Sequence, residues 1–311
     1  MPLPRRNFIG YGRDYPKIAW PDGARIAISL VCNYEEGSEL TPVNGDDGPE
    51  PEGDNFLAEG TARELRNESW MEYGSRVGVW RLLDVLERNN VKSTWFACGY
   101  ALALNPAAGA AMVDGGHEAA SHGYRWMPGA QNMSRADMEL DVQNAVLSAF
   151  EACGERPQGW YSNRGLNPDT RQLLQEEGGF LYDCDAFDDD LPYFVSHVDS
   201  RKKWLVIPYN LACNDMKFWR APGHSQPDDF YYQMKSTFDR LYREGQDHPQ
   251  MMTVGLHFRF AGMPSKADAL DRFIKYAKGF PDVWFARRID IANWWYENYI
   301  DFPILEGPDD L

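Results

Sequence analysis

The chain has 311 residues, of which 43% are hydrophobic and 25% charged, an ordinary globular composition. Its formal net charge of −16 argues against a nucleic-acid-binding or anionic-membrane-binding surface, because both need a basic face. The N-terminal stretch lacks the apolar run of a signal peptide, and no apolar stretch approaches the roughly 18 residues that span a bilayer. The five cysteines are scattered and form no CxxC pair, which indicates reduced thiols. We therefore expect a soluble, cytoplasmic protein with neither nucleic acid nor membrane as its partner.

Strand-like and helix-like segments alternate along most of the chain. In the first half, the patterns predict strands over 24–34, 91–99, 117–122 and 157–162, and helices over 75–90, 105–116 and 134–153. In the second half, they predict strands over 180–187, 203–211, 251–260 and 283–288, and helices over 167–179, 227–244, 265–280 and 289–299. This alternation is typical of an α/β fold. No linker interrupts it, so we expect a single domain over residues 1–311.

One long loop follows the first predicted strand, over residues 37–70, and it is rich in Gly, Pro and acidic residues. Loops of this length are usually functional or disordered. Because the loop directly follows Glu35 and Glu36, we expect it to act as a lid or as a subunit contact. No glycine-rich phosphate loop follows the first strand, which weakens a dinucleotide-binding interpretation.

Polar residues follow the predicted strands at their carboxyl ends. In a parallel barrel these ends converge on one face, where active sites lie. Each residue taken alone could be structural, but the recurrence at six strand ends predicts a site. The residues are Glu35, Glu36, His122, Tyr161, Asn163, Arg164, Asp183, Asp185, Asn210 and His257.

The stretch "HEAASHGYRW" bears on metal binding. Catalytic zinc prefers three protein ligands plus water, and Glu36 and His122 could supply two of them. The position one helical turn after His122 holds Trp126, whose indole N–H has no lone pair to offer. Asp183 or His257 could be a distant third ligand, although the spacing does not signal it. We therefore predict general acid–base chemistry without a metal or other cofactor, and zinc at Glu36 and His122 is the less favoured alternative.

The ordered set "NYEEG", "SHGYRW", "FLYDCDAFDDDLPY" and "VGLHFR" resembles the NodB-type polysaccharide deacetylase superfamily, and within it the allantoinase branch. The resemblance runs nearly end to end. It implies a deformed (β/α) barrel with about seven parallel strands, a homotetramer and a hydrolase that does not require metal.

Carried over position by position, the superfamily's first motif of base and metal ligand becomes Glu35 and Glu36. The second motif, normally two histidines, becomes His122 and Trp126, as in the allantoinase branch. The resemblance matches His257 to the last-motif histidine and Asp183 to the fourth-motif aspartate. The third-motif arginine is absent, since "GWYSNRG" has Trp160 and Tyr161 there and Arg164 is displaced. This departure argues against sugar deacetylation.

These observations predict a hydrolase that opens a cyclic amide, with allantoin as the expected substrate and allantoate as the product. Glu35, tuned by Glu36, would activate water, and His257 or His122 would protonate the leaving nitrogen. The catalytic set is Glu35, Glu36, His122, His257 and Asp183, and the expected substrate contacts are Trp126, Trp160, Tyr161, Asn163, Arg164, Asp185 and Asn214. Because two strand-end stretches differ in detail from the allantoinases, a hydantoinase or cyclic imide hydrolase stays open. A metal-dependent carbohydrate N-deacetylase and a non-catalytic binding protein are the further alternatives.

Overall fold

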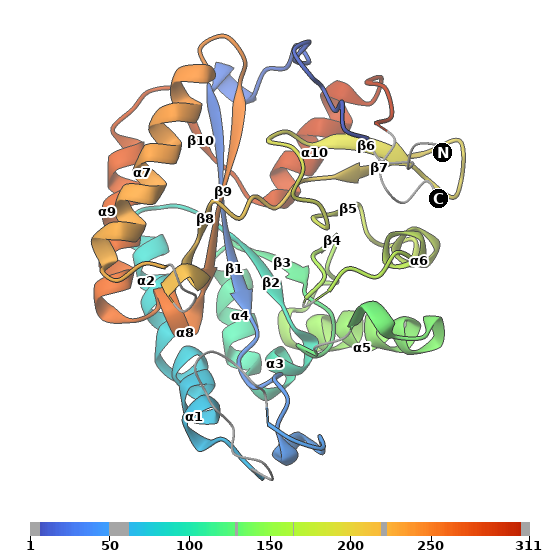
Figure 1. Ribbon diagram of the computed structural model, residues 1–311, viewed down its shortest axis with the longest axis vertical. Helices are drawn as coiled ribbons and strands as arrows, with labels where there is room; N and C mark the ends of the chain where they lie inside the picture. Colours follow the sequence, from blue (N-terminus) through green and yellow to red (C-terminus); the bar gives the residue numbers. More distant parts are fainter. Residues whose placement is uncertain (1–6, 50–61, 128–129, 164, 219–222, 306–311) are drawn as a thin grey trace.

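The structure is a computed structural model that describes residues 7–49, 62–127, 130–163, 165–218 and 223–305. Its described strands form one curled sheet in the order β6-β7-β5-β4-β3-β2-β1-β9-β8, and β10 pairs with β1 (Figure 1). The strands are β1 Ile26–Tyr34, β2 Thr94–Ala97, β3 Glu118–Ser121, β4 Gly159–Trp160, β5 Tyr182–Asp183, β6 Tyr193–Ser196, β7 Lys203–Val206, β8 Cys213–Asn214, β9 Gln250–His257 and β10 Val283–Phe285. The path ends at β6 and β8, so the sheet is a half-barrel. The predicted α/β class and deformed barrel are confirmed.

The described sheet has ten strands, more than the seven or so that were predicted. The strands that were not predicted are β6 and β8, and β8 is only two residues long, too short to be recognised from alternation. The additional strand β6 pairs with β7 antiparallel, whereas the other pairings are parallel. The acidic run before Pro192 separates β5 from β6, so the predicted strand over 180–187 shortens to Tyr182–Asp183.

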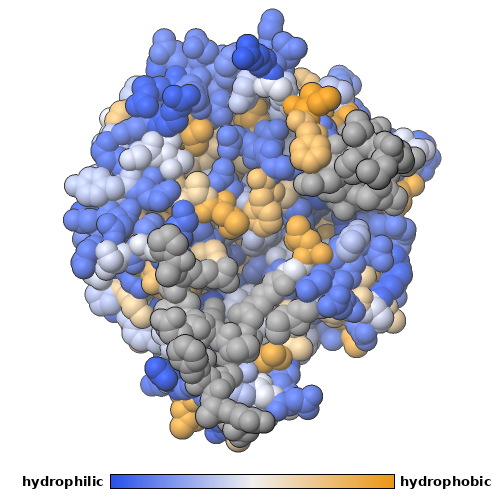
Figure 2. Space-filling view, viewed as in Figure 1, coloured by the Kyte–Doolittle hydropathy of each residue, from blue (hydrophilic) through white to orange (hydrophobic). Residues whose placement is uncertain are grey.

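Most of the helices lie on the outside of the sheet (Figure 1), whereas the last one contributes Ile291, Ala292 and Trp295 to the buried cluster that contains Ala27 and Val31 of β1. They are α1 Leu65–Tyr73, α2 Val79–Arg88, α3 Gly99–Leu104, α4 Pro106–Asp114, α5 Arg135–Cys153, α6 Thr170–Glu177, α7 Pro227–Glu244, α8 Phe258–Ala261, α9 Pro264–Lys278 and α10 Arg288–Tyr299. The described helices include none that is both long and apolar enough to cross a membrane. On the face in Figure 2, hydrophilic side chains predominate, and hydrophobic ones gather toward the middle.

The predicted loop over 37–70 is shorter than expected. Residues 50–61 lie outside the described part of the chain, and α1 already begins at Leu65, where the Glu64 side chain accepts a hydrogen bond from the Arg66 amide. A π-helical stretch, Gly74–Gly78, joins α1 to α2 without a break. The sequence concealed α1 because its polar and charged residues carry almost no amphipathic pattern.

Strand β1 runs through the centre of the sheet and has two differently covered faces. Ile28, Leu30 and Cys32 pack into the cluster formed with the outer helices. Ala27 and Val31 belong to the cluster inside the half-barrel. Because side chains alternate along a strand, the inner face continues through Asn33. This inner face leads to the carboxylate pair.

Candidate active site

The carboxylates Glu35 and Glu36 directly follow β1, and each is only 2% exposed. His122 follows β3, and His257 is the last residue of β9. In the sheet, β3 lies two strands from β1 on one side, and β9 is its neighbour on the other. The parallel strands therefore place one imidazole on each side of Glu35.

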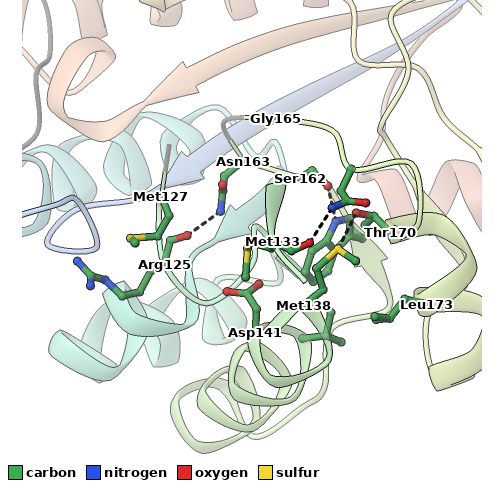
Figure 3. A pocket seen from close by; sticks show the side chains of 13 residues that line it. Arg125, Met127, Met133, Met138, Asp141, Ser162, Asn163, Gly165, Thr170 and Leu173 are labelled. Atoms are coloured by element: carbon green, nitrogen blue, oxygen red, sulfur yellow. Dashed lines mark hydrogen bonds between the residues drawn. The ribbon is translucent and has the colours of Figure 1, made fainter. Parts of the chain in front are cut away.

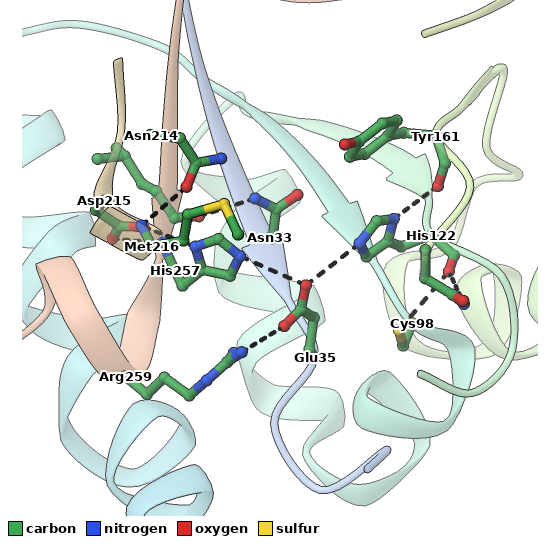
Figure 4. A network of polar contacts seen from close by, with 12 residues as sticks. Asn33, Glu35, Cys98, His122, Tyr161, Asn214, Asp215, Met216, His257 and Arg259 are labelled. Carbon is green, nitrogen blue, oxygen red and sulfur yellow. Dashed lines mark hydrogen bonds and ion pairs between the residues drawn. The ribbon is translucent and has the colours of Figure 1, made fainter. Parts of the chain in front are cut away.

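Glu35 lies at the centre of a polar cluster (Figure 4). Its Oε1 atom is 3.3 Å from His122 Nε2 and 3.6 Å from His257 Nε2. Its Oε2 atom is 2.8 Å from an Arg259 guanidinium nitrogen. Each carboxylate oxygen of Glu35 thus faces a group that can carry a positive charge.

The Nδ1 atoms of both histidines are held by acceptors. His122 Nδ1 is 2.6 Å from the Tyr161 carbonyl oxygen, and His257 Nδ1 is 2.6 Å from Asp215 Oδ1. A carbonyl or a carboxylate accepts hydrogen bonds, so each Nδ1 carries a proton. The atoms that can exchange protons in the site are therefore the two Nε2 atoms that face Glu35.

Asp215 follows β8 and holds His257 at two points. Its second oxygen accepts hydrogen bonds from the backbone amides of His257 at 2.8 Å and Ala261 at 3.0 Å. Burial would lower the pKa of His257, but the carboxylates of Glu35 and Asp215 outweigh it, and the pKa is raised. His257 is therefore suited to hold a proton near neutral pH.

Arg259 is a buried cation beside both carboxylates, with 1% of its surface exposed. Besides Glu35, it lies 3.7 Å from Glu36. Its guanidinium lies 5.3 Å from the centroid of the Trp126 ring, and the rings of Trp70 and Phe260 lie at 5.7 and 5.1 Å. These aromatic faces stabilise a desolvated guanidinium.

The pKa values of the two adjacent carboxyls shift in opposite directions. Burial raises the pKa of both, but for Glu35 the charges of Arg259, His257 and His122 prevail and lower the pKa well below its usual range. For Glu36, burial and the Glu35 charge outweigh Arg259 and raise the pKa to about 7. Sequence analysis expected Glu36 to tune Glu35; in the structure the two pKa values shift in opposite directions, and that of Glu35 is the lowered one.

Glu36 is held by backbone rather than by the histidines. Its oxygens accept hydrogen bonds from the amides of Glu35 at 2.9 Å and Arg259 at 3.2 Å. A side chain at Gly74, in the π-helical stretch, would overlap the Glu36 carboxylate. The glycine therefore lets the helix pack directly on this carboxyl.

The residues present do not fit a divalent metal at Glu36 and His122. Nε2 of His122 faces Glu35, whereas the Glu36 oxygens point to backbone amides. A second cation would lie beside the buried Arg259 guanidinium, and the indole at Trp126 offers no lone pair. Within the described ranges, no group of three or more His, Cys, Asp or Glu side chains is arranged to hold a metal ion.

Asp183 lies away from this cluster. Its Oδ2 accepts hydrogen bonds from Arg171 Nε at 2.7 Å and Trp204 Nε1 at 2.5 Å. Its Oδ1 accepts from Arg171 at 3.1 Å and from the Asp185 amide at 2.9 Å. The structure does not bring Asp183 to Glu35 or to either histidine.

The other residues predicted to contact substrate fall into two groups. Tyr161 stacks on His122, with ring centroids 5.1 Å apart, and Asn214 donates to the Tyr209 hydroxyl at 3.1 Å, so both border the Glu35 cluster. Trp126 borders it through Arg259. Asp185 instead accepts hydrogen bonds from the amide and hydroxyl of Ser162, and Trp160 donates to the same hydroxyl.

Asn163 stabilises the segment after β3, because its side chain donates hydrogen bonds to the carbonyls of His122 and Arg125 at 2.9 and 2.7 Å. With Trp160 and Ser162 it lines a small cavity of about 40 Å³ beside α5, where three methionines also point (Figure 3). None of the residues in contact with the Glu35 carboxylate lines this cavity. Arg164 lies outside the described residues.

Sequence reasoning missed two members of the cluster, Arg259 and Asp215. Arg259 follows a strand-end histidine by two residues, and Asp215 follows the Asn214 that was selected. Both lie one or two positions beyond an observed strand, β8 or β9, but the strands predicted over 203–211 and 251–260 end elsewhere, so a search from the predicted ends would not have found them. Their partners, however, come from distant strands and are visible only in the fold.

The fold and cluster define a hydrolase of the NodB type, and comparisons with known proteins agree. The sequence profile of the polysaccharide deacetylase family matches residues 71–181. A Schizosaccharomyces pombe protein named as a polysaccharide deacetylase is 35% identical, with 91% of this chain and 94% of that protein covered. The chain belongs to the polysaccharide deacetylase family.

Two solved structures narrow the placement within the family. A protein from Pseudomonas aeruginosa PAO1, also named as a polysaccharide deacetylase, is 45% identical with a TM-score of 0.88, over 96% of this chain and 100% of that chain. PuuE allantoinase is 45% identical with a TM-score of 0.88, over 95% of this chain and 98% of that chain. The allantoinase branch of the family is thereby supported.

Proposed function

We propose that this hydrolase opens the ring of a cyclic amide, and that allantoin, converted to allantoate, is its substrate. The observation that carries the proposal is the position of Glu35, whose ionised carboxylate faces two imidazole Nε2 atoms and one guanidinium. Amide hydrolysis needs a group that takes a proton from water and a group that gives one to the leaving nitrogen. The likeness to PuuE allantoinase supports the choice of ring.

In the proposed mechanism, Glu35 removes a proton from the water that attacks the ring carbonyl. His257, which Asp215 holds with its Nε2 toward Glu35, then gives a proton to the departing nitrogen. His122, held by the Tyr161 carbonyl, hydrogen bonds to the reacting group from the other side. One C–N bond breaks and one C–O bond forms, with a carboxylate and a free amide nitrogen as products.

Arg259 supplies the positive charge of the site in this proposal. Its guanidinium keeps Glu35 ionised in the resting enzyme. As negative charge develops on the attacked carbonyl oxygen, that charge competes with Glu35 for the nearby cation. The carboxylate then becomes more basic as it receives the proton. Preorganised charge of this kind is usually the largest contribution to catalysis.

The test is turnover of allantoin by the purified enzyme with and without a chelator. We expect the rate to be insensitive to chelation. Glu35→Gln should lower kcat by at least about 100-fold, because positioned proton transfer contributes about 10²–10⁴-fold. Glu72→Gln is the matched control, since Glu72 is an exposed glutamate on α1. Full activity in the Glu35→Gln variant would exclude Glu35 as the base.

The same assay separates the alternatives. Turnover of other hydantoins or cyclic imides, but not of allantoin, would change the substrate and keep the chemistry. Zinc- or cobalt-dependent release of acetate from an N-acetylated sugar would support the deacetylase that the names of the relatives suggest. Ligand-induced thermal stabilisation with no turnover of any of these compounds would indicate a binding protein.

A further inference from the structure

Asn33 lies on the inner face of β1, two residues before Glu35, and is paired in the sheet with His257. It is only 2% exposed. Its Nδ2 donates hydrogen bonds to the Leu256 carbonyl at 3.3 Å and to the Tyr209 hydroxyl at 3.2 Å. Because the carbonyl can only accept, the orientation of the amide is determined, and Oδ1 points the other way. Among the described residues, this buried Oδ1 has no hydrogen-bond partner.

The Tyr209 hydroxyl has an unused hydrogen-bond donor, where Asn33 has an unused acceptor. It accepts one hydrogen bond from Asn33 Nδ2 and a second from Asn214 Nδ2 at 3.1 Å. The Asn214 amide is also oriented, because its Oδ1 accepts from the Met216 backbone amide at 2.9 Å. Both lone pairs of the hydroxyl are therefore used, while the described residues offer no acceptor for its proton. Burial raises the pKa of Tyr209, so the proton stays in place.

This acceptor and this donor lie beside the reacting groups. The Tyr209 ring stacks on the Tyr161 ring at 4.3 Å, and Tyr161 stacks on His122. Figure 4 shows Asn33 between the two imidazoles, next to Glu35. Buried polar groups are normally satisfied, so an unused acceptor and an unused donor side by side indicate a missing ligand.

We infer that Asn33 Oδ1 and the Tyr209 hydroxyl bind one N–H and one C=O of the substrate ring. The inference rests on the proposed function and adds the feature of the substrate that is recognised. In a ring of five or six atoms the amide is cis, so its N–H and C=O project from the same edge and can reach a neighbouring acceptor and donor together. An acyclic N-acetyl group has a trans amide, whose N–H and C=O point in opposite directions. The pair thus selects cyclic amides, imides and hydantoins over N-acetylated sugars.

The experiment compares hydantoin with its two N-methylated forms, because methylation removes one N–H without altering the protein. We expect wild type to lose at least about tenfold in kcat/KM with one of the two forms, the size of one hydrogen bond. In Asn33→Ala this preference should disappear, since the acceptor is gone and the methyl group has room. Ser29→Ala is the matched control, another buried polar residue of β1, and should keep the wild-type preference. Thermal unfolding of each variant verifies that it is folded.

Calorimetric binding of the same three compounds separates the two proposals. Hydantoin binding that weakens at least tenfold in Asn33→Ala and in Tyr209→Phe, while wild type turns over neither hydantoin nor allantoin, would uphold the recognition pair and overturn the proposed hydrolysis. Turnover with an unchanged methylation preference in Asn33→Ala would overturn the recognition pair alone. If wild type neither binds nor hydrolyses allantoin or any of the three compounds, both proposals fail.

Discussion

Two buried carboxylate–arginine pairs lie at strand ends of this half-barrel, and they differ in what surrounds the carboxylate. Asp183 is enclosed by Arg171, Trp204 and a backbone amide, so each of its oxygens has two donors. Glu35 has Arg259 on one oxygen, and its other oxygen faces two imidazoles whose protons can move. A saturated carboxylate stabilises a fold, whereas one that shares an oxygen between titratable groups can transfer protons.

The largest effect expected from this comparison of the two carboxylate–arginine pairs is at Arg259, the partner of Glu35. Arg259→Met should lower kcat by about 10²–10³-fold, the usual loss for a preorganised electrostatic group. Because Arg259 lowers the pKa of Glu35, its removal should also move the acidic limb of the kcat/KM profile to higher pH. Arg259→Lys keeps the charge and should retain part of both effects. An acidic limb that stays in place in Arg259→Met would show that Arg259 does not govern the charge of Glu35.

At the other pair we expect a loss of stability instead of activity. Asp183→Asn leaves the Arg171 guanidinium buried without its anion, which should lower the free energy of unfolding by about 3–5 kcal/mol. The kcat of the folded protein should change little, because Asp183 has no contact with the Glu35 cluster. Urea unfolding and kcat measured on the same preparation provide the test. A large fall in kcat at unchanged stability would instead support the catalytic role that the resemblance implies for Asp183.

A smaller effect on the pH profile distinguishes which of the two histidines is the acid. Asp215→Asn removes one of the two carboxylates that raise the pKa of His257 against its burial. The pKa of His257 should fall, and the alkaline limb of the rate profile, which reports its protonated form, should move to lower pH. We expect kcat to fall by about 100-fold, with the exposed Asp268→Asn as control. An alkaline limb that does not move would assign the acid to His122.

The fold was predictable in class, because alternating segments of strand and helix character are local properties of the chain. The number of strands was not, since β8 is a two-residue ladder that exists only through its neighbour β9, and β6 pairs antiparallel with β7 after the acidic run. The start of α1 was missed because most of its residues are polar and packing on α8 and the π-helical stretch determines it.

The residues of the candidate site likewise divide into those that the sequence could select and those that only the fold reveals. Glu35, Glu36, His122 and His257 could be selected because each stands at the end of an apolar run. The same rule selects Asp183, and nothing local distinguishes it, because Arg171 and Trp204 approach it from other elements. The roles of Arg259 and Asn33 depend on contacts between strands far apart in sequence, which no spacing rule contains.

A third buried carboxyl, Glu39, extends the comparison to a site where burial prevails. It is 3% exposed, and its Oε2 has no hydrogen-bond partner among the described residues. Burial raises its pKa to about 7, so the folded state binds a proton that the unfolded state releases near pH 4.5. Stability from this group therefore falls as pH rises from about 4.5 to about 7, opposite to Glu35, whose lowered pKa makes stability fall as pH decreases.

Glu39→Gln should raise the free energy of unfolding at pH 8 by about 1–3 kcal/mol, with little change at pH 4.5. Urea unfolding at the two pH values, with Glu72→Gln as control, measures the difference, and an equal effect of Glu39→Gln at both would show that Glu39 is ionised in the folded protein like Glu35.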